Sequence, residues 1–195
     1  MYKNIKDVLR LIMKKRYSIS NFFTPDYMFK SFDEVTPSFL RSIGIDALLI
    51  DIDNTLAPYE QPDADERIID WFESLKEAGI KAALISNNHP PRVERFNEKL
   101  GLIAYADCGK PKSRMLLVAM TQMGSTNENT AGLGDQILTD TGAAHNLGLP
   151  SLIVPPIKDK TNAFYKVKRA IERPFVKRYR KEHHDNGPFP KWPKY

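Results

Sequence analysis

The apolar run at residues 47–52, Ala-Leu-Leu-Ile-Asp-Ile, limits the possible folds of this chain more than any other segment. Such a run is typical of a strand buried on both faces of a parallel sheet, and its end in carboxylates is unusual. Further strands are expected at 81–85, 103–106, 130–134 and 151–154, and helices at about 65–78, 91–100, 115–123 and 140–147. The strand at 130–134 is expected to be weak because it lacks branched apolar residues. Alternating strands and helices predict an α/β, three-layer Rossmann-like fold, with a parallel sheet of about five strands and helices on both faces.

Polar side chains gather where these strands end. Asp51 and Asp53 end the first strand two residues apart, so both carboxylates point to the same side of the backbone. Ser86 ends the second strand, and Asp135 follows the fourth. Ligands of such sheets bind beyond the carboxyl ends of the strands. Two like charges this close need a cation, and Mg²⁺ suits them because it takes carboxylate oxygens, water and substrate phosphate as ligands.

The composition fits one compact domain and limits the compartment. With 195 residues, of which 42% are hydrophobic, the chain has room for a single core. The only cysteine, Cys108, excludes an internal disulfide framework, so we expect a reducing compartment and a cytoplasmic location. No apolar run approaches the ~20 residues that span a bilayer, and no signal peptide is expected. The net charge of +5 fits a nucleic-acid binder, a membrane-surface protein or an enzyme acting on phosphates equally well.

Four motifs in order carry a resemblance to the phosphohydrolases of the haloacid dehalogenase (HAD) superfamily. They are Asp-x-Asp-x-Thr at 51–55, Ser86, Lys110 in Gly-Lys-Pro, and the acidic pair Asp135 and Asp140. The segments Asp-x-Asp-Asn-Thr-Leu, Ile-Ser-Asn-Asn and Gly-Asp-Gln-x-x-Thr-Asp resemble the YqeG-type branch of subclass IIIA. That branch is similar to the phosphatidylglycerophosphate phosphatases. The resemblance covers roughly residues 20–157, and the short intervals between its motifs leave no room for a large cap domain.

The resemblance implies a two-step phosphatase mechanism around Mg²⁺. Asp51 would be the nucleophile, and would form an aspartyl phosphate. Asp53 would be the general acid and base, within reach of the leaving oxygen and the attacking water. Asp51, Asp135 and the backbone carbonyl of Asp53 would hold the metal.

The same resemblance assigns the phosphate-binding and supporting residues. Ser86 and the main-chain N–H of Asn87 would hold phosphoryl oxygens, and Lys110 would neutralise charge on the transferring group. Asp140 would orient this lysine or a metal-bound water. Thr55, the last residue of the first motif, is grouped with Asp140 as a supporting residue.

We divide the chain into a basic amphipathic lead-in at 1–42, an HAD-like catalytic domain at 43–157, and a basic helix and tail at 158–195. Apolar residues recur at helical spacing from Ile5 to Met13 and predict an amphipathic helix, whose other positions carry Lys3, Lys6, Arg10 and Lys14. That helix either lies on a membrane surface or docks on its own domain, while residues 21–42 read as a connector. The basic C-terminal part is expected to form a surface helix and a loosely ordered end.

Other residues of reactive type have simpler interpretations. Lys112 competes with Lys110 as the cation of the third motif, and the family pattern of lysine directly before proline favours Lys110. Cys108 is expected to be a buried thiol that fills space near the site, because no paired histidine motif accompanies it. The histidines lack metal-ligand spacing, and we expect His145 to be a surface or capping residue.

The substrate is the least constrained part of the prediction. The open site, the basic ends and the resemblance favour a lipid phosphate such as phosphatidylglycerophosphate, with peripheral membrane contact. A small phosphomonoester is the alternative within the same reaction. A third hypothesis is that the basic tail binds RNA or the ribosome and the HAD fold serves as a binding module, although no RRM-type or KH-type signature accompanies it. The sequence predicts no oligomeric state.

Overall fold

The computed structural model describes residues 17–18, 20–158 and 163–183. The amphipathic helix predicted at Ile5 to Met13 and the end of the tail lie outside the described residues. The strands are β1 (Tyr27–Met28), β2 (Ala47–Ile50), β3 (Lys81–Ile85), β4 (Ile103–Tyr105), β5 (Thr130–Gly134) and β6 (Ser151–Ile153). The helices are η1 (Phe32–Glu34), α2 (Pro37–Ser42), α3 (Glu66–Glu77), α4 (Pro90–Asn97), α5 (Arg114–Met123), α6 (Gly142–Asn146) and α7 (Ala163–Glu182), with a π-helical turn, η2 (Ile137–Thr141).

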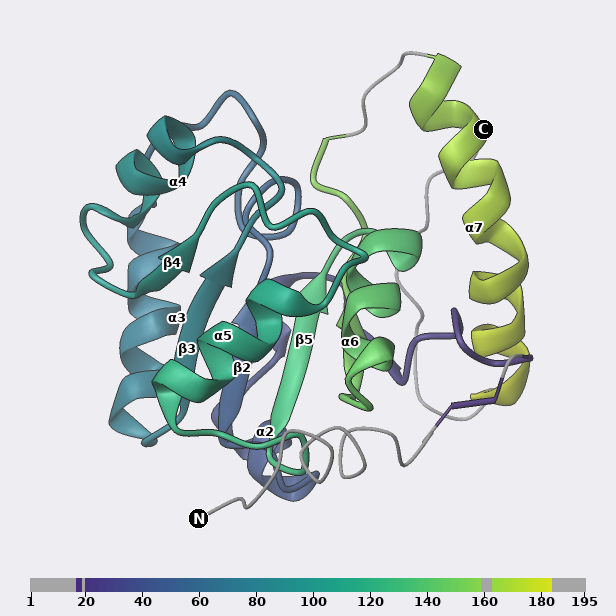
Figure 1. Ribbon diagram of the computed structural model, residues 1–195, viewed down its shortest axis with the longest axis horizontal. Coiled ribbons are helices and arrows are strands. Elements are labelled where there is room, and N and C mark those ends of the chain that lie inside the picture. The colour runs from purple at the N-terminus through teal and green to yellow at the C-terminus, as the bar shows by residue number, and fades with distance from the viewer. Residues whose placement is uncertain (1–16, 19, 159–162, 184–195) are drawn as a thin grey trace.

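All strands run parallel in one sheet, in the order β1-β6-β5-β2-β3-β4 (Figure 1). The predicted α/β architecture is confirmed, and among the described residues the sheet has six strands where about five were expected. The additional strand is β1, which has two residues and lies in the segment predicted as a connector. The chain proceeds from β2 to β3 and β4 on one side and then returns to β5 on the other. The switch point therefore lies between β2 and β5, where α/β sheets bind ligands.

The two faces of β2 pack against different helices, which makes three layers. Leu48 and Ile50 belong to a core cluster that includes apolar residues of α2, α3 and α4. Ala47 and Leu49 belong to a second cluster with residues of α5 and α6. Because neighbouring strand residues point to opposite faces, the continuous apolar run buries both faces at once.

The strand predicted to be weak, β5, is the neighbour of β2 in the sheet. Its glycines allow close packing. A Cβ atom at Gly132 would lie 3.0 Å from Cβ of Ala144 on α6, and one at Gly134 would lie 2.3 Å from Cγ of Asp140. The strand lacks branched residues because neighbouring elements occupy the space that those side chains would need.

Helix α7 packs at the side of the sheet that carries β1 and β6 (Figure 1). Val176 of α7 contacts Ile137 and Ile153 in a third apolar cluster. The prediction of a surface helix was incomplete, because Arg169 and Glu172 of α7 are buried. The interpretation of His145 as a surface or capping residue was wrong, since its side chain is buried beneath the N-terminal segment.

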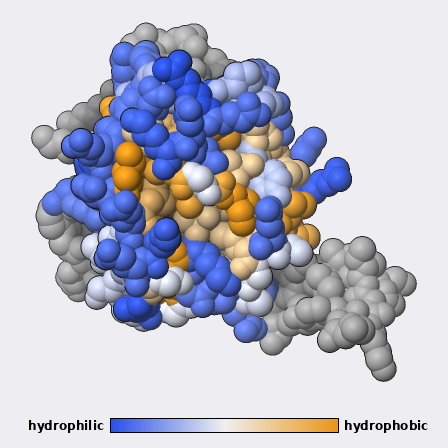
Figure 2. All heavy atoms as spheres, turned by 90° about the vertical axis from the view of Figure 1, so that its left-hand side faces the viewer, coloured by the Kyte–Doolittle hydropathy of each residue, from blue (hydrophilic) through white to orange (hydrophobic). Residues whose placement is uncertain are grey.

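The opposite edge of the sheet carries an apolar cleft of about 580 Å³. Figure 2 shows the apolar side chains gathered on this face of the molecule. The lining residues include Ile69, Phe72, Leu100, Leu102 and Ile103, with Lys76 and Lys99 among them. Because Gly79 and Ile80 precede β3 and also line the cleft, it lies toward the amino end of that strand, away from the polar cluster.

Two negative findings concern the described residues. Residues 51–65, between β2 and α3, contain an isolated bridge from Asp53 to Ala57 but no helix or regular strand, so this interval holds no large cap. Within residues 17–18, 20–158 and 163–183, no helix combines the length and apolar character required to cross a bilayer.

Candidate active site

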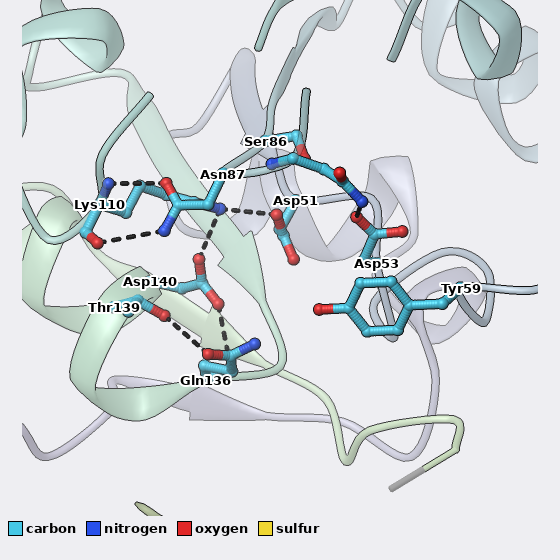
Figure 3. Close-up of a pocket in the computed structure, with 10 residues that line it drawn as sticks. Asp51, Asp53, Tyr59, Ser86, Asn87, Lys110, Gln136, Thr139 and Asp140 are labelled. Carbon is cyan, nitrogen blue, oxygen red and sulfur yellow. Dashed lines mark hydrogen bonds and ion pairs between the residues drawn. The ribbon is translucent and has the colours of Figure 1, made fainter. Parts of the chain in front are cut away.

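A cavity of about 390 Å³ opens at the carboxyl ends of the central strands, and Figure 3 shows the side chains that line it. They are Asp51, Asp53, Tyr59, Ser86, Asn87, Asn88, Lys110, Gln136, Thr139 and Asp140. Asp135 is fully buried next to this group, and Thr55 places Oγ1 3.5 Å from Oδ2 of Asp51. The structure therefore brings together residues from all four motifs that the sequence analysis selected.

Lys110 is the cation at the centre of the site. Its Nζ lies 2.7 Å from Oδ1 of Asp51 and 2.7 Å from Oδ1 of Asp140, and all three side chains are less than a tenth exposed. Burial works to lower the pKa of Lys110, but the two carboxylates outweigh burial and raise that pKa above its ordinary range. Lys112, the alternative cation, is exposed to solvent. Lys110 is thus the lysine whose charge faces the cavity.

Asp51, Asp135 and Asp140 each offer one carboxylate oxygen, and these three atoms lie within 4.8 Å of one another. Burial raises the pKa of Asp51 to about 7 and that of Asp135 to about 8, although Lys110 and Arg169 oppose the two shifts. Oδ1 of Asp135 is buried and has no hydrogen-bond partner among the described residues. A small hard cation bound by oxygen ligands satisfies such a group, so the donor set fits Mg²⁺.

The charge balance is compatible with the same ion. In the described part of the chain, five buried carboxylates belong to the site and its surroundings: Asp51, Asp53, Asp135, Asp140 and Glu172. Ion pairs join them to three cations, Lys110, Arg92 and Arg169. Buried charges are stable only when they are compensated, and here either protons, as the raised pKa values of Asp51 and Asp135 indicate, or a bound cation such as Mg²⁺ can compensate the carboxylates.

The carboxylate of Asp53 is outside the three-carboxylate cluster and has its own partners. Its Oδ2 accepts a hydrogen bond of 3.0 Å from Nδ2 of Asn88, and its Oδ1 accepts one of 3.2 Å from Nε of Arg92. The metal ligand that the resemblance implies at this residue is its backbone carbonyl. The sequence analysis gave no role to Asn88 or Arg92, although Asn88 is the last residue of the quoted segment Ile-Ser-Asn-Asn.

The loop after β3 holds two of the predicted phosphate ligands. Oγ of Ser86 accepts a hydrogen bond of 3.0 Å from the backbone N–H of Asn88. The side chain of Asn87 accepts a hydrogen bond of 2.7 Å from the backbone N–H of Lys110 and donates one of 3.1 Å to the carbonyl of Lys110. The amide of Asn87 therefore ties the loop after β3 to the loop that carries Lys110.

The loop after β5 fixes Asp140. Oδ2 of Asp140 accepts a hydrogen bond of 2.9 Å from the backbone N–H of Gln136, which leaves Oδ1 for Lys110. The lack of a side chain at Gly134 makes this approach possible, because any Cβ there would overlap Asp140. Gln136 and Thr139 also line the cavity; the sequence analysis included them in the segment Gly-Asp-Gln-x-x-Thr-Asp and gave them no role.

Arg169 of α7 reaches the site from the part of the chain that was placed outside the catalytic domain. Its Nη2 lies 2.7 Å from Oδ2 of Asp135, and its Nη1 donates a hydrogen bond of 3.0 Å to the carbonyl of Asp135. The basic composition of the C-terminal segment concealed this residue among arginines and lysines expected to face solvent. The one usable signal was Glu172, an acidic residue three positions away on the same helix face.

A parallel α/β sheet with aspartates, serine and lysine at its carboxyl end defines a hydrolase of the haloacid dehalogenase type, and the family model for haloacid dehalogenase-like hydrolases matches residues 29–148. The chain belongs to this family. Over 166 residues it is 31% identical to the protein named Probable phosphatase YqeG of Bacillus subtilis (strain 168), covering 85% of this chain and 96% of that protein. These findings confirm the predicted superfamily and the prediction of an enzyme, an HAD-type phosphatase.

A solved structure has the same fold. The putative 3-deoxy-D-manno-octulosonate 8-phosphate phosphatase of Vibrio cholerae is similar with a TM-score of 0.50 and 16% sequence identity. The match covers 78% of this chain and 93% of that one. At this identity the similarity concerns the fold, and the roles of individual residues must be argued from the site itself.

Proposed function

We propose that this enzyme is a Mg²⁺-dependent phosphomonoester hydrolase that works through an aspartyl-phosphate intermediate. The observation that carries the proposal is the contact of Lys110 with both Asp51 and Asp140, in a cavity of about 390 Å³ beside a buried three-carboxylate cluster. A nucleophile, a cation for the phosphoryl group and a divalent metal site then lie within one cavity. This is the set of parts that phosphoryl transfer requires.

The chemistry proceeds in two displacements at phosphorus. A carboxylate oxygen of Asp51 attacks phosphorus, the bond from phosphorus to the ester oxygen breaks, and Asp53 donates a proton to the leaving alcohol. Asp53 then takes a proton from the water that attacks the phosphorus, the bond to Asp51 breaks, and free phosphate leaves. This second displacement restores both aspartates.

The remaining residues bind and neutralise the transferring group. Ser86 and the main-chain N–H of Asn87 hold phosphoryl oxygens, and the ammonium of Lys110 offsets their charge. Asp51, Asp135 and the carbonyl of Asp53 would hold Mg²⁺, which would supply further charge stabilisation to the phosphoryl group. Asp140 and Thr55 orient Lys110 and Asp51.

The test is hydrolysis of p-nitrophenyl phosphate with and without Mg²⁺. Wild-type protein should be active with Mg²⁺ and inactive after chelation. Asp51→Asn should lose at least about 1,000-fold in kcat, because an amide is not a nucleophile for phosphorus. Asp70→Asn makes the same change at an exposed position of α3 and should retain full activity. Activity of Asp51→Asn within tenfold of wild type would exclude this mechanism.

For the substrate we propose a lipid phosphate such as phosphatidylglycerophosphate, with the enzyme in peripheral contact with a membrane. Two apolar side chains one helical turn apart on α7, Val167 and Ile171, are 60% and 51% exposed. Between them, Lys168 donates a hydrogen bond to Gln136 on the cavity wall. An apolar surface beside an open cavity suits a headgroup that remains attached to its acyl chains, and the net charge of +5 attracts anionic membranes.

A substrate panel separates the lipid from a small phosphomonoester. Phosphatidylglycerophosphate in mixed micelles should be turned over faster than sugar or nucleotide phosphates. The double substitution Val167→Ser with Ile171→Ser should lower turnover of the lipid and leave turnover of p-nitrophenyl phosphate unchanged. If a small phosphate is turned over as fast as the lipid, the lipid is not the favoured substrate.

A further inference from the structure

Arg169 and Glu172 are unusual on α7 because their side chains are almost completely withdrawn from solvent, with exposed fractions of 1% and 0%. Burying a guanidinium and a carboxylate in a protein interior is unfavourable unless both find good partners. The partners of this pair lie in the loop between β5 and α6, which contains Asp135 and Asp140. The buried pair therefore connects the C-terminal helix to the acidic cluster.

Arg169 holds Asp135 at two points. One nitrogen, Nη2, lies 2.7 Å from Oδ2 of the carboxylate. The other, Nη1, donates a hydrogen bond of 3.0 Å to the main-chain carbonyl of the same residue. Because the guanidinium is planar, two contacts from one fork fix both the position and the rotation of the aspartate. A lysine ammonium in this place would keep the positive charge but could not make both contacts from one planar group.

The two oxygens of Asp135 consequently have different surroundings. Oδ2 is occupied by Arg169, whereas Oδ1 is buried with no hydrogen-bond partner in the described part of the chain. Asp135 also contributes one oxygen to the group within 4.8 Å that includes Asp51 and Asp140. The arrangement assigns one oxygen to the arginine and leaves the other for the metal.

Glu172 extends the same support to the rest of the loop. Its Oε2 lies 2.8 Å from Nη1 of Arg169, which aligns the guanidinium, and its Oε1 accepts a hydrogen bond of 3.4 Å from the backbone N–H of Leu138 in η2. Turn η2 also carries Asp140. One helix thus fixes the segment that supplies two of the three clustered carboxylates.

We propose that Arg169 is a positioning residue for the metal ligand Asp135, that Glu172 orients Arg169, and that α7 is therefore a structural part of the metal centre. This inference rests on the proposed function, since it requires the three-carboxylate cluster to bind Mg²⁺. Residues that orient a metal ligand contribute about 10-fold to 100-fold to metal affinity or activity. If Arg169 only balanced charge, Arg169→Lys, which keeps the positive charge, would leave the affinity for Mg²⁺ unchanged.

The experiment is calorimetric titration of the full-length metal-free protein with MgCl₂, together with thermal unfolding in chelator. Arg169→Lys and Glu172→Gln should each weaken Mg²⁺ binding about 10-fold or more, with a rise in the Mg²⁺ concentration for half-maximal activity. Arg114→Lys on α5 and Glu77→Gln on α3 are the same substitutions at exposed positions and should bind Mg²⁺ as wild type does. Unfolding in chelator reports any loss of stability separately.

Glu172→Gln keeps nearly the same shape, so it decides the question if Arg169→Lys does not fold. Folded variants that bind Mg²⁺ within twofold of wild type would overturn the positioning role, even if their melting temperatures fall. Failure of the proposed function gives a different result. In that case wild-type protein itself neither binds Mg²⁺ nor hydrolyses p-nitrophenyl phosphate.

Discussion

At the scale of single residues, the site depends on the absence of a side chain at Gly134. This glycine has no positive φ, so alanine could adopt its backbone conformation. The obstacle is steric, because a Cβ would lie 2.3 Å from Cγ of Asp140, whose Oδ1 contacts Lys110. Asp140 would have to move, and the ion pair with Lys110 would move with it.

We therefore expect Gly134→Ala to lower the free energy of unfolding by about 1–3 kcal/mol and kcat by about 100-fold, through overpacking and displacement of Asp140. Gly132→Ala is the matched control, because its Cβ would meet Cβ of Ala144 at 3.0 Å and has no atom of Asp140 within 4 Å. It should lose stability and keep its kcat. Urea unfolding and p-nitrophenyl phosphate kinetics measure both effects, and equal kcat values in the two variants would contradict the argument.

At the scale of elements, a buried network ties the N-terminal segment to α6 and β6. The carboxylate of Asp26 accepts hydrogen bonds from the hydroxyl of Tyr17 at 2.8 Å and the backbone N–H of Ser151 at 2.9 Å. Nε2 of His145 lies 2.9 Å from the same carboxylate, while Nδ1 lies 2.6 Å from the carbonyl of Phe22. Burial raises the pKa of Asp26, but hydrogen bonds led by that from His145 outweigh burial, and the pKa falls below 3.8.

Asp26→Asn should reduce the free energy of unfolding by about 2 kcal/mol, since it removes a charged acceptor that serves three groups. Chymotrypsin should also cleave the N-terminal segment faster, at aromatic residues such as Phe22 and Phe23, because its attachment to α6 and β6 is weakened. Asp46→Asn, at an exposed position, is the control. Identical urea midpoints for the two variants would mean that the network does not anchor the segment.

The elements also show what a sequence pattern can and cannot predict. Helix α3 follows its pattern closely, because Asp65 caps it through a hydrogen bond from the backbone N–H of Ile68 and Gly79 ends it. Strand β5 was underestimated because its glycines are required by neighbours that a local pattern does not reveal. The burial of Arg169 was missed for the same reason, since a basic helix contains no local sign of which cation turns inward.

At the scale of the whole molecule, the four motifs predicted which residues gather at one edge of the sheet, because the parallel sheet brings the ends of distant strands together. The division of the chain at residues 42 and 157 stays a prediction. Two contacts cross these boundaries. Strand β1 pairs with β6, and Arg169 of α7 forms an ion pair with Asp135. Such long-range pairings follow from the packing of the complete chain and have no signature within either segment.

The buried acidic cluster should also make the stability of the whole protein depend on pH and metal. Without metal, the pKa values of Asp51 and Asp135 in the folded protein are raised to about 7 and about 8, against 3.8 for an ordinary aspartate. The folded protein therefore keeps protons that the unfolded chain has already released. This contribution to stability is complete below pH 3.8 and is lost as the pH rises through the two folded-state values.

In chelator, the melting temperature should thus fall between about pH 5.5 and about pH 8.5, by about 3 °C or more if the effect reaches 1 kcal/mol. Lys110 keeps its charge over this range because its pKa is raised, so it does not offset the fall. Saturating Mg²⁺ should remove most of the fall, since it binds the ionised carboxylates of the folded state. Asp135→Asn lacks one of the titrating groups and should show a smaller decline. Differential scanning calorimetry at the two pH values measures this, and a melting temperature in chelator that stays constant or rises with pH would contradict the linkage.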